Sequence, residues 1–321
     1  MYIDEKTISL FPTVEYPYID EVTSDIFEEY GLPRLGGASG RGWSSFATIQ
    51  RCPHLYKVTY LDRFRGTPGK ALEVGSIMHT LLALYYSWMV DDNWKLTPEI
   101  MKNALMQRGA RPESVIEGWR LFDAYQNHYT SDYIYPIAQE VWAQDPDGNT
   151  CRYDLIARVV EDQPGIPAGI FNIEHKSAAR FSQPYLDGWR NDGEVIGQMM
   201  IWKRSGLDEK YGELKGTIVN IIGKQKVPLF HRTIIPLEAW HVSQHAQDLK
   251  MWTAIRNMYE ASGFWPKSRT NCTNKYGTCQ IFDSCASNQE PKTIDQLIQI
   301  SLDKTVKAAA EMSPNDTEAD D

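Results

Sequence analysis

Two short segments combine acidic and basic residues in a pattern that suits hydrolytic chemistry: YDLIARV at 153–159 and FNIEHKS at 171–177. Both are expected to be strands. On the second strand Glu174 and Lys176 lie two residues apart, so both side chains leave the same face of the sheet. If the two strands pair, the carboxylate of Asp154 lies beside that of Glu174.

Two carboxylates at one position repel each other unless a cation neutralises them, and their hard oxygen atoms suit Mg²⁺ or Mn²⁺. A neighbouring lysine could polarise an attacking water molecule or stabilise developing negative charge. These residues therefore suit metal-assisted hydrolysis of a phosphodiester. The alternative is an ordinary exposed ion pair between Glu174 and Lys176. Phe171, Ile173 and the DLIA run favour interior strands instead, where unpaired charges are penalised.

A second group of candidate residues lies in NCTNKYGTCQIFDSC at 271–285, which holds three of the five cysteines. Five cysteines are few for a chain of this length and cannot all pair, which argues against a secreted disulfide framework. Clustered thiols in a reducing compartment more often bind metal. Cys272, Cys279 and Cys285 therefore predict a metal site that needs a fourth ligand from elsewhere in the chain.

The elements that must position these residues follow one another in a clear order. A helix is expected over 46–60, with Ser44 or Ser45 as its N-cap, and a stronger helix over 71–90. Strands are expected at 137–144, 151–160 and 170–178 as an antiparallel meander, a helix at 192–206, a strand pair at 216–224 and 229–236, and a long amphipathic helix at 237–263.

Three segments are expected along the 321 residues, of which 42% are hydrophobic. An acidic, loop-rich segment covers 1–43, and a short helix with an acidic disordered tail covers 287–321. A single domain covers 44–286. It comprises a helical part at 44–135, a core sheet at 136–235, and a long helix with the cysteine-rich segment at 236–286.

The formal charge of −9 is distributed unevenly. Residues 1–30 carry eight acids against one lysine, and residues 311–321 carry five acids and no base, which leaves +3 for residues 31–310. The central part can therefore bind phosphate, and the acidic ends could recruit a protein partner. No apolar run approaches the roughly 20 residues of a membrane span, and the first thirty residues do not have the pattern of a leader. A cytoplasmic protein without membrane contact is expected.

Four stretches, in order, resemble the motifs of the PD-(D/E)XK nuclease superfamily, and within it the RecB-like branch that includes CRISPR-associated and phage-encoded exonucleases. GSIMHTLL is similar to the family's Gly-x-x-x-His helix, which implies His79 as a metal ligand. YDLIARV is similar to the Asp strand, which implies Asp154 as a ligand. NIEHKSA is similar to the Glu-x-Lys strand, which implies Glu174 and the carbonyl of His175 as ligands and Lys176 as the catalytic lysine.

The fourth stretch, GQMMIW, resembles the family's Gln-x-x-x-Tyr helix, with Gln198 at the glutamine. Trp202 stands where a tyrosine is usual. It keeps a flat ring for stacking on a base or sugar but lacks the hydroxyl. Cys151 replaces a glycine usual three residues before the aspartate, which indicates a modified turn. Glu140 lies on the first strand, where relatives often carry an acid near the active site, and a supporting part is expected for it.

The resemblance also implies a fourth partner for the clustered cysteines. A subset of this branch carries an iron–sulfur cluster, with one cysteine before the nuclease core and three after it. Cys52, in IQRCPHLYK, matches the early position, and Cys272, Cys279 and Cys285 match the late ones. The implied cofactor is a 4Fe–4S cluster, with structural Zn²⁺ as the alternative. Zinc sites more often use two close Cys-x2-Cys pairs, which this chain lacks.

The resemblance implies an α/β (α+β) fold with a restriction-endonuclease-like core, in which helices flank a mixed central sheet. The expected activity is Mg²⁺- or Mn²⁺-dependent hydrolysis of DNA, in single strands or at duplex ends, by an exonuclease. One alternative is a restriction-type endonuclease. Others are a catalytically silent DNA-binding or adaptor subunit, and a structural metal protein with a coincidental Glu-x-Lys. The intact Asp154, Glu174 and Lys176 argue against a silent subunit.

Overall fold

The computed structural model describes residues 42–62, 64, 69–90, 102–103, 105–106, 110–130, 132–274 and 277–287. The acidic N-terminal segment and the C-terminal tail fall almost wholly outside this part of the chain, so the expectations for them, and the segment boundaries, stay predictions. Among the described residues no helix is both long and apolar enough to cross a membrane.

The first described helices meet at Cys52. α3 (Trp43–Arg51) and α4 (Pro53–Tyr56) are followed by a π-helical turn, η1 (Lys57–Leu61). The single helix expected over 46–60 is therefore wrong. Cys52 is extended, with φ −165° and ψ 112°, because the helical conformation is disfavoured for a residue before proline. The expected N-cap is also wrong: α3 starts after Gly42, whose carbonyl accepts from the Ser45 hydroxyl at 2.8 Å.

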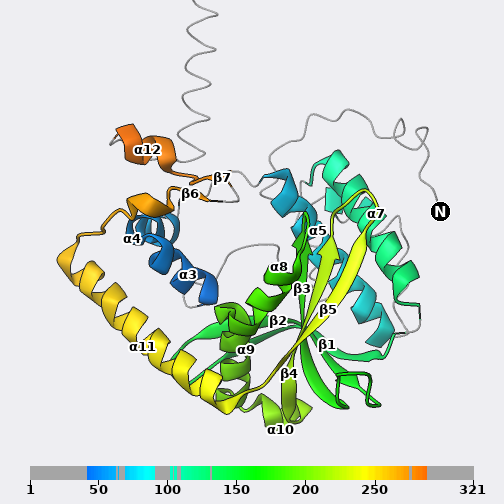
Figure 1. Ribbon diagram of the computed structural model, residues 1–321. Coiled ribbons are helices and arrows are strands. Elements are labelled where there is room, and N and C mark those ends of the chain that lie inside the picture. The colour runs from blue at the N-terminus through cyan, green and yellow to red at the C-terminus, as the bar shows by residue number, and fades with distance from the viewer. Residues whose placement is uncertain are drawn as a thin grey trace, which may run out of the picture.

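The central sheet has five strands in the order β1-β2-β3-β4-β5 (Figure 1). β1 (Ile134–Gln144), β2 (Thr150–Val159) and β3 (Gly169–Ala178) form the expected antiparallel meander. β4 (Leu214–Gly223) and β5 (Leu229–Pro236) form the expected antiparallel pair. β4 runs parallel to β3, so the sheet is mixed and the expected fold class is confirmed.

The parallel pairing of β3 and β4 requires a crossover connection. This connection contains α8 (Gln183–Gly188), the 3₁₀ turn η2 (Trp189–Asn191), α9 (Gly193–Arg204) and α10 (Leu207–Tyr211). α9 confirms the helix expected over 192–206. The sequence pattern does not predict α8 or α10, because each is too short for a helical period to show.

Helices cover both faces of the sheet (Figure 1). α5 (Lys70–Val90), which confirms the helix expected over 71–90, packs with α7 (Pro112–His128) on one face around a core that includes Leu81 and Ile173. α9 covers the other face around a core that includes Met199 and Val219, and the expected long helix, α11 (Ala239–Ser262), packs on α9. Each fully buried side chain of this size contributes about 1.5–3 kcal/mol, so the two cores hold the sheet firmly between its helices.

Candidate active site

The predicted acidic residues lie where β2 and β3 separate. The ladder between the two strands ends at the pair Leu155↔Ile173, whereas β3 stays paired with β4 as far as Ala178. Asp154 and Glu174 are the next residues on their strands. In place of a ladder bond, Asp154 Oδ2 accepts from the backbone N–H of His175 at 2.9 Å. The two acids therefore meet as expected, although at a fork in the sheet and not within a paired stretch.

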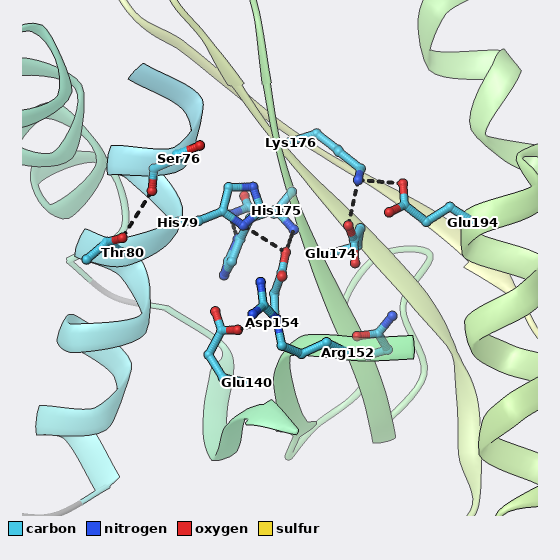
Figure 2. A network of polar contacts seen from close by, with 12 residues as sticks. Ser76, His79, Thr80, Glu140, Arg152, Asp154, Glu174, His175, Lys176 and Glu194 are labelled. Carbon is cyan, nitrogen blue, oxygen red and sulfur yellow. Dashed lines mark hydrogen bonds and ion pairs between the residues drawn. The ribbon is translucent and has the colours of Figure 1, made fainter. Parts of the chain in front are cut away.

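A local distortion of β1 lies beside Asp154. The register of β1 and β2 places Glu140 across from Asp154. Glu140 has φ 53°, in the left-handed region that residues other than glycine seldom adopt, and such strain costs about 1–3 kcal/mol. Its carboxylate pairs with Arg152 Nε at 2.7 Å, and Figure 2 shows both residues next to Asp154. Glu140 thus lies beside the candidate site with Arg152 as its partner.

α5 brings His79 to Asp154, with 3.3 Å between Nδ1 and Oδ2. Burial opposes the charged imidazole, but the carboxylates of Asp154 and Glu174 outweigh burial and raise the pKa of His79 to about 8. The reverse holds for Asp154: burial would raise its pKa, but His79 above all lowers it well below the usual range. Asp154 is therefore ionised, and two donors hold it in place.

Gly75, one turn before His79, lets α5 approach β3 closely. A Cβ atom at Gly75 would lie 2.9 Å from Ser177 Oγ. Residues four apart share a helix face, so the face that carries His79 is also the face that lies against β3. The Gly-x-x-x-His spacing thus has a steric cause in this chain.

Enlarging Gly75 should therefore destabilise the fold in proportion to the size of the new side chain. We expect Gly75→Ala to change the free energy of unfolding by less than about 1 kcal/mol, because the Ser177 hydroxyl can rotate away and alanine favours a helix. Gly75→Val should cost about 1–3 kcal/mol by overpacking. Urea unfolding measures both variants, and wild-type stability in Gly75→Val would contradict the close contact.

Glu174 is 3% exposed, and both of its carboxylate oxygens have partners. Oε1 lies 2.6 Å from Lys176 Nζ, and Oε2 accepts from Gln198 Nε2 at 2.7 Å. Burial, followed by the negative charge of Asp154, raises the pKa of Glu174 to about 8. The fork therefore disfavours the ionised form of Glu174, and a bound cation would offset this penalty.

Gln198 is oriented by Asn172, a residue that no motif identifies. Asn172 Nδ2 donates to Gln198 Oε1 at 2.7 Å, so Gln198 turns its own amide nitrogen towards Glu174. Asn172 is fully buried on β3. It lies two residues before Glu174 and so on the same strand face, which is the signal in the sequence that could have found it.

Removing this amide should weaken the site without abolishing the fold. In Asn172→Leu the Oε1 atom of Gln198 loses its donor and Glu174 loses an oriented partner, so any hydrolytic rate should fall by about 10- to 100-fold. Ser87→Ala is a control, because it removes a buried hydroxyl, bonded to Ala83 O at 2.8 Å, outside the site. Equal rates in the two variants would contradict the role of Asn172.

The side chain of His175 points to the opposite face of the sheet, into a buried polar row. Its Nδ1 lies 2.9 Å from Asn220 Nδ2, and Asn220 Nδ2 also donates to Tyr125 Oη at 3.0 Å. Arg232, the neighbour of Asn220 on β5, pairs with Asp132 at 2.6 and 2.7 Å. Burial lowers the pKa of His175 to about 3, so its imidazole is neutral. This polar row therefore fixes His175, the middle residue of Glu-x-Lys, from the face of the sheet opposite to Glu174 and Lys176.

Trp202 does not face the candidate site. Its side chain is fully buried against Tyr153 and Tyr211, and its Nε1 donates to Asp208 at 2.8 Å. The expectation that this ring could stack on a base or sugar is therefore wrong. Sequence spacing places Trp202 one turn after Gln198, but the long indole extends into the core between α9 and the sheet.

Among the described residues no three histidine, cysteine, aspartate or glutamate side chains are already arranged to hold a metal ion. Mg²⁺, however, is usually bound by one or two protein carboxylates, and water and substrate phosphate complete its shell. Asp154 and Glu174 fit this mode, because both are buried and the charge of Asp154 acts on Glu174. A cation would relieve that repulsion.

The four cysteines expected to hold a cluster gather at one end of the molecule, where α4 lies near α12 (Phe282–Ser287) and the short hairpin β6 (Thr273–Asn274) and β7 (Gly277–Thr278) (Figure 1). Ser268 N donates to Cys52 Sγ at 3.4 Å, and Cys279 N donates to Cys272 O at 2.8 Å. Burial raises the pKa of Cys285, and the other three thiols act in the same direction. All four are free thiols, a donor set that fits thiolate ligation, although among the described residues they do not form a group placed to hold a metal ion.

Comparisons with known proteins give little independent guidance. No protein-family model matches the sequence, and a comparison with curated proteins found no match. Among solved structures, the chain is similar to a proposed exonuclease from Eubacterium rectale, with 13% identity over 81% of this chain and 92% of that one and a TM-score of 0.48. It is also similar to the protein SSO0001, with 12% identity over 65% and 85% of the two chains and a TM-score of 0.24. Likenesses this distant do not indicate a function for this chain.

Proposed function

We propose that this protein is a metal-dependent DNA nuclease that hydrolyses phosphodiester bonds as an exonuclease. The observation that carries the proposal is the meeting of Asp154, Glu174 and Lys176 at the fork between β2 and β3. Asp154 is 8% and Glu174 is 3% exposed. Two carboxylates buried side by side suit binding of a divalent cation, and a lysine beside them suits the charge that develops on a phosphate under attack.

Asp154 and Glu174 would hold Mg²⁺ or Mn²⁺, with His79 and the carbonyl of His175 as further ligands. The N–H of His175 points to Asp154. The N–H and C=O of one strand residue point to the same neighbouring strand, so this carbonyl faces the same gap. When bound, the cation would neutralise charge on the phosphoryl oxygens and lower the pKa of a bound water molecule.

Lys176 would stabilise the negative charge of the pentavalent transition state. Burial opposes its charge, but Glu174 and then Glu194 outweigh burial and raise the pKa of its ammonium. Lys176 is therefore a charged donor, which favours electrostatic stabilisation over deprotonation of the attacking water. Gln198 would keep Glu174 oriented through its bond to Oε2.

Three substrates test the activity and its type: end-labelled single-stranded DNA, linear duplex DNA and closed circular DNA, each with Mg²⁺, with Mn²⁺ and with a chelator. An exonuclease should shorten the linear substrates from an end, only with a metal, and leave the circle intact. Cleavage of the circle would instead support the restriction-type endonuclease. Equal degradation by wild type and Asp154→Asn would overturn the proposal, whereas DNA binding without hydrolysis would support the adaptor subunit.

We further propose that Cys52, Cys272, Cys279 and Cys285 hold a 4Fe–4S cluster that joins the N-terminal helices to the C-terminal segment. Several hydrogen bonds join these parts; for example, Asn271 Nδ2 donates to Arg51 O at 2.8 Å, and Arg51 donates to Asn271 O at 3.4 Å. Metal–sulfur bonds would offset the entropy of closing so long a loop. The proposed cluster would therefore have a structural role, at a distance from the site of the proposed hydrolysis.

Purification without oxygen tests the cluster. The wild type should be brown with absorbance at about 400 nm, the range expected of iron–sulfur clusters, and Cys285→Ser should lose the colour and unfold at a lower temperature. Cys151→Ser is the matched control, because Cys151 lies on β2 and outside this group. Stoichiometric zinc without iron would contradict the cluster and support a structural Zn²⁺ site. A protein purified without any metal would contradict both the cluster and the zinc site.

A further inference from the structure

Glu194 is an acidic residue of the candidate site that no motif includes. It lies in the first turn of α9, four residues before Gln198 and so on the same helix face. Its Oε2 lies 2.7 Å from Lys176 Nζ, and Figure 2 shows Lys176 between Glu174 and Glu194. The Glu194 side chain is 40% exposed and that of Glu174 is 4% exposed. Lys176 thus joins a buried carboxylate to one that solvent reaches.

We propose that Glu194 is a positioning residue, which keeps the Lys176 ammonium in the site when a divalent cation occupies the carboxylate of Glu174. The inference rests on the proposed function, because it assumes that the cation binds there. Such a cation competes with Lys176 for Glu174 and repels the ammonium. A lysine side chain has a flexible four-carbon stem, so without a second partner it would swing towards water.

Glu194 is well placed to act as that second partner. Asp192, the N-cap of α9, accepts from the backbone N–H groups of Glu194 and Val195 at 2.9 and 3.2 Å, which fixes the first turn of the helix. A carboxylate in the first turn of a helix also interacts favourably with the helix dipole. The ring of Trp189, 5.8 Å from Lys176 Nζ, borders the ammonium on another side.

Glu194 also brings into balance the charges of the cation, its proposed carboxylate ligands and the ion-paired Lys176. Asp154, Glu174 and Glu194 supply three negative charges, and Lys176 with a divalent cation supplies three positive ones, because His79 would have to lose its proton to bind the cation. Without Glu194 the loaded site would carry a net positive charge, and the weakest-held cation would be the lysine. Removing Glu194 should therefore displace Lys176 only after the metal is added.

Reductive methylation of lysines with formaldehyde, read by mass spectrometry, tests this conditional effect without any need for nuclease activity. In wild type, Mn²⁺ should leave the labelling rate of Lys176 unchanged. In Glu194→Gln, Mn²⁺ should raise that rate several-fold, because the flexible Lys176 side chain then extends into water. Glu260→Gln is the matched control, because its side chain is 45% exposed and its partner, Arg256, lies at 3.8 Å on α11. Equal labelling of Glu194→Gln with and without Mn²⁺ would overturn the inference.

Metal binding and kinetics separate positioning from ligation. The affinity for Mn²⁺ should be the same in Glu194→Gln and wild type, whereas a tenfold weaker affinity would make Glu194 a ligand and contradict its positioning role. We expect kcat to fall by about 10- to 100-fold with little change in KM. If Glu194→Gln keeps the wild-type kcat while hydrolysis still depends on Lys176, this inference is wrong and the proposed function stands. Equal hydrolysis by wild type and Lys176→Met would instead refute the proposed function.

Discussion

Replacing Lys176 with methionine should lower the rate of DNA hydrolysis by about 10²- to 10³-fold, the loss typical when one charged or polar group that stabilises a transition state is removed. Methionine fills a similar volume but lacks the ammonium 2.6 Å from Glu174 Oε1. The affinity for Mn²⁺ should not fall, because Glu174 loses a competitor for its carboxylate. Single-turnover rates on end-labelled linear DNA and a Mn²⁺ titration measure the two effects.

The matched control for this prediction is Lys203→Met on α9. Lys203 is 29% exposed against 21% for Lys176, and it is also ion-paired, 2.8 Å from Asp208. It lies outside the fork, so its variant should keep the wild-type rate. A comparable loss of hydrolytic rate in both variants would indicate a general effect of removing a partly buried positive charge, and not a role of Lys176 in the chemistry.

The second large effect concerns stability: Asp132→Asn should cost about 3–5 kcal/mol of the free energy of unfolding, the cost of leaving a buried charge unpaired. The Arg232 side chain is 5% exposed, and Asp132 is its carboxylate partner, at 2.6 and 2.7 Å. Its guanidinium also lies 3.7 Å from the centre of the Tyr129 ring, so water cannot easily replace the lost carboxylate. Urea unfolding of the metal-free protein measures the change.

Two comparisons make this prediction specific. Asp62→Asn removes one partner of an exposed pair, 36% and 45% exposed, and should change stability by less than about 1 kcal/mol. The double variant Asp132→Leu, Arg232→Met should recover most of the stability lost in Asp132→Asn, because apolar residues can replace a buried pair at little cost. Failure of the double variant to recover would show that the bonds from Arg232 towards Tyr125 and Asn220 matter more than the charge.

Local pattern predicts the elements of this chain well where they are long and regular. The strands β1 to β5 and the helices α5, α9 and α11 lie where periodicity places them. The prediction fails at Cys52, where Pro53 forces an extended residue into a helical pattern, and it misses α8 and α10. These failures have local causes: the proline effect can be recognised in the sequence, whereas a helix of one or two turns leaves too short a pattern.

The sequence by itself determined the spacing of Glu174 and Lys176 on one strand and the place of Asp154 on the strand before it, and the resemblance to a known family added His79 and Gln198 on helices. It could do so because each spacing is a property of one element. Only the tertiary structure decided that β2 and β3 separate at these acids, that Asn172 orients Gln198, that Trp202 is buried and that Glu194 holds Lys176. Those contacts join residues from different elements that pack together in space. The period of one element can be recognised in a short stretch of sequence, but the packing of one element against another cannot.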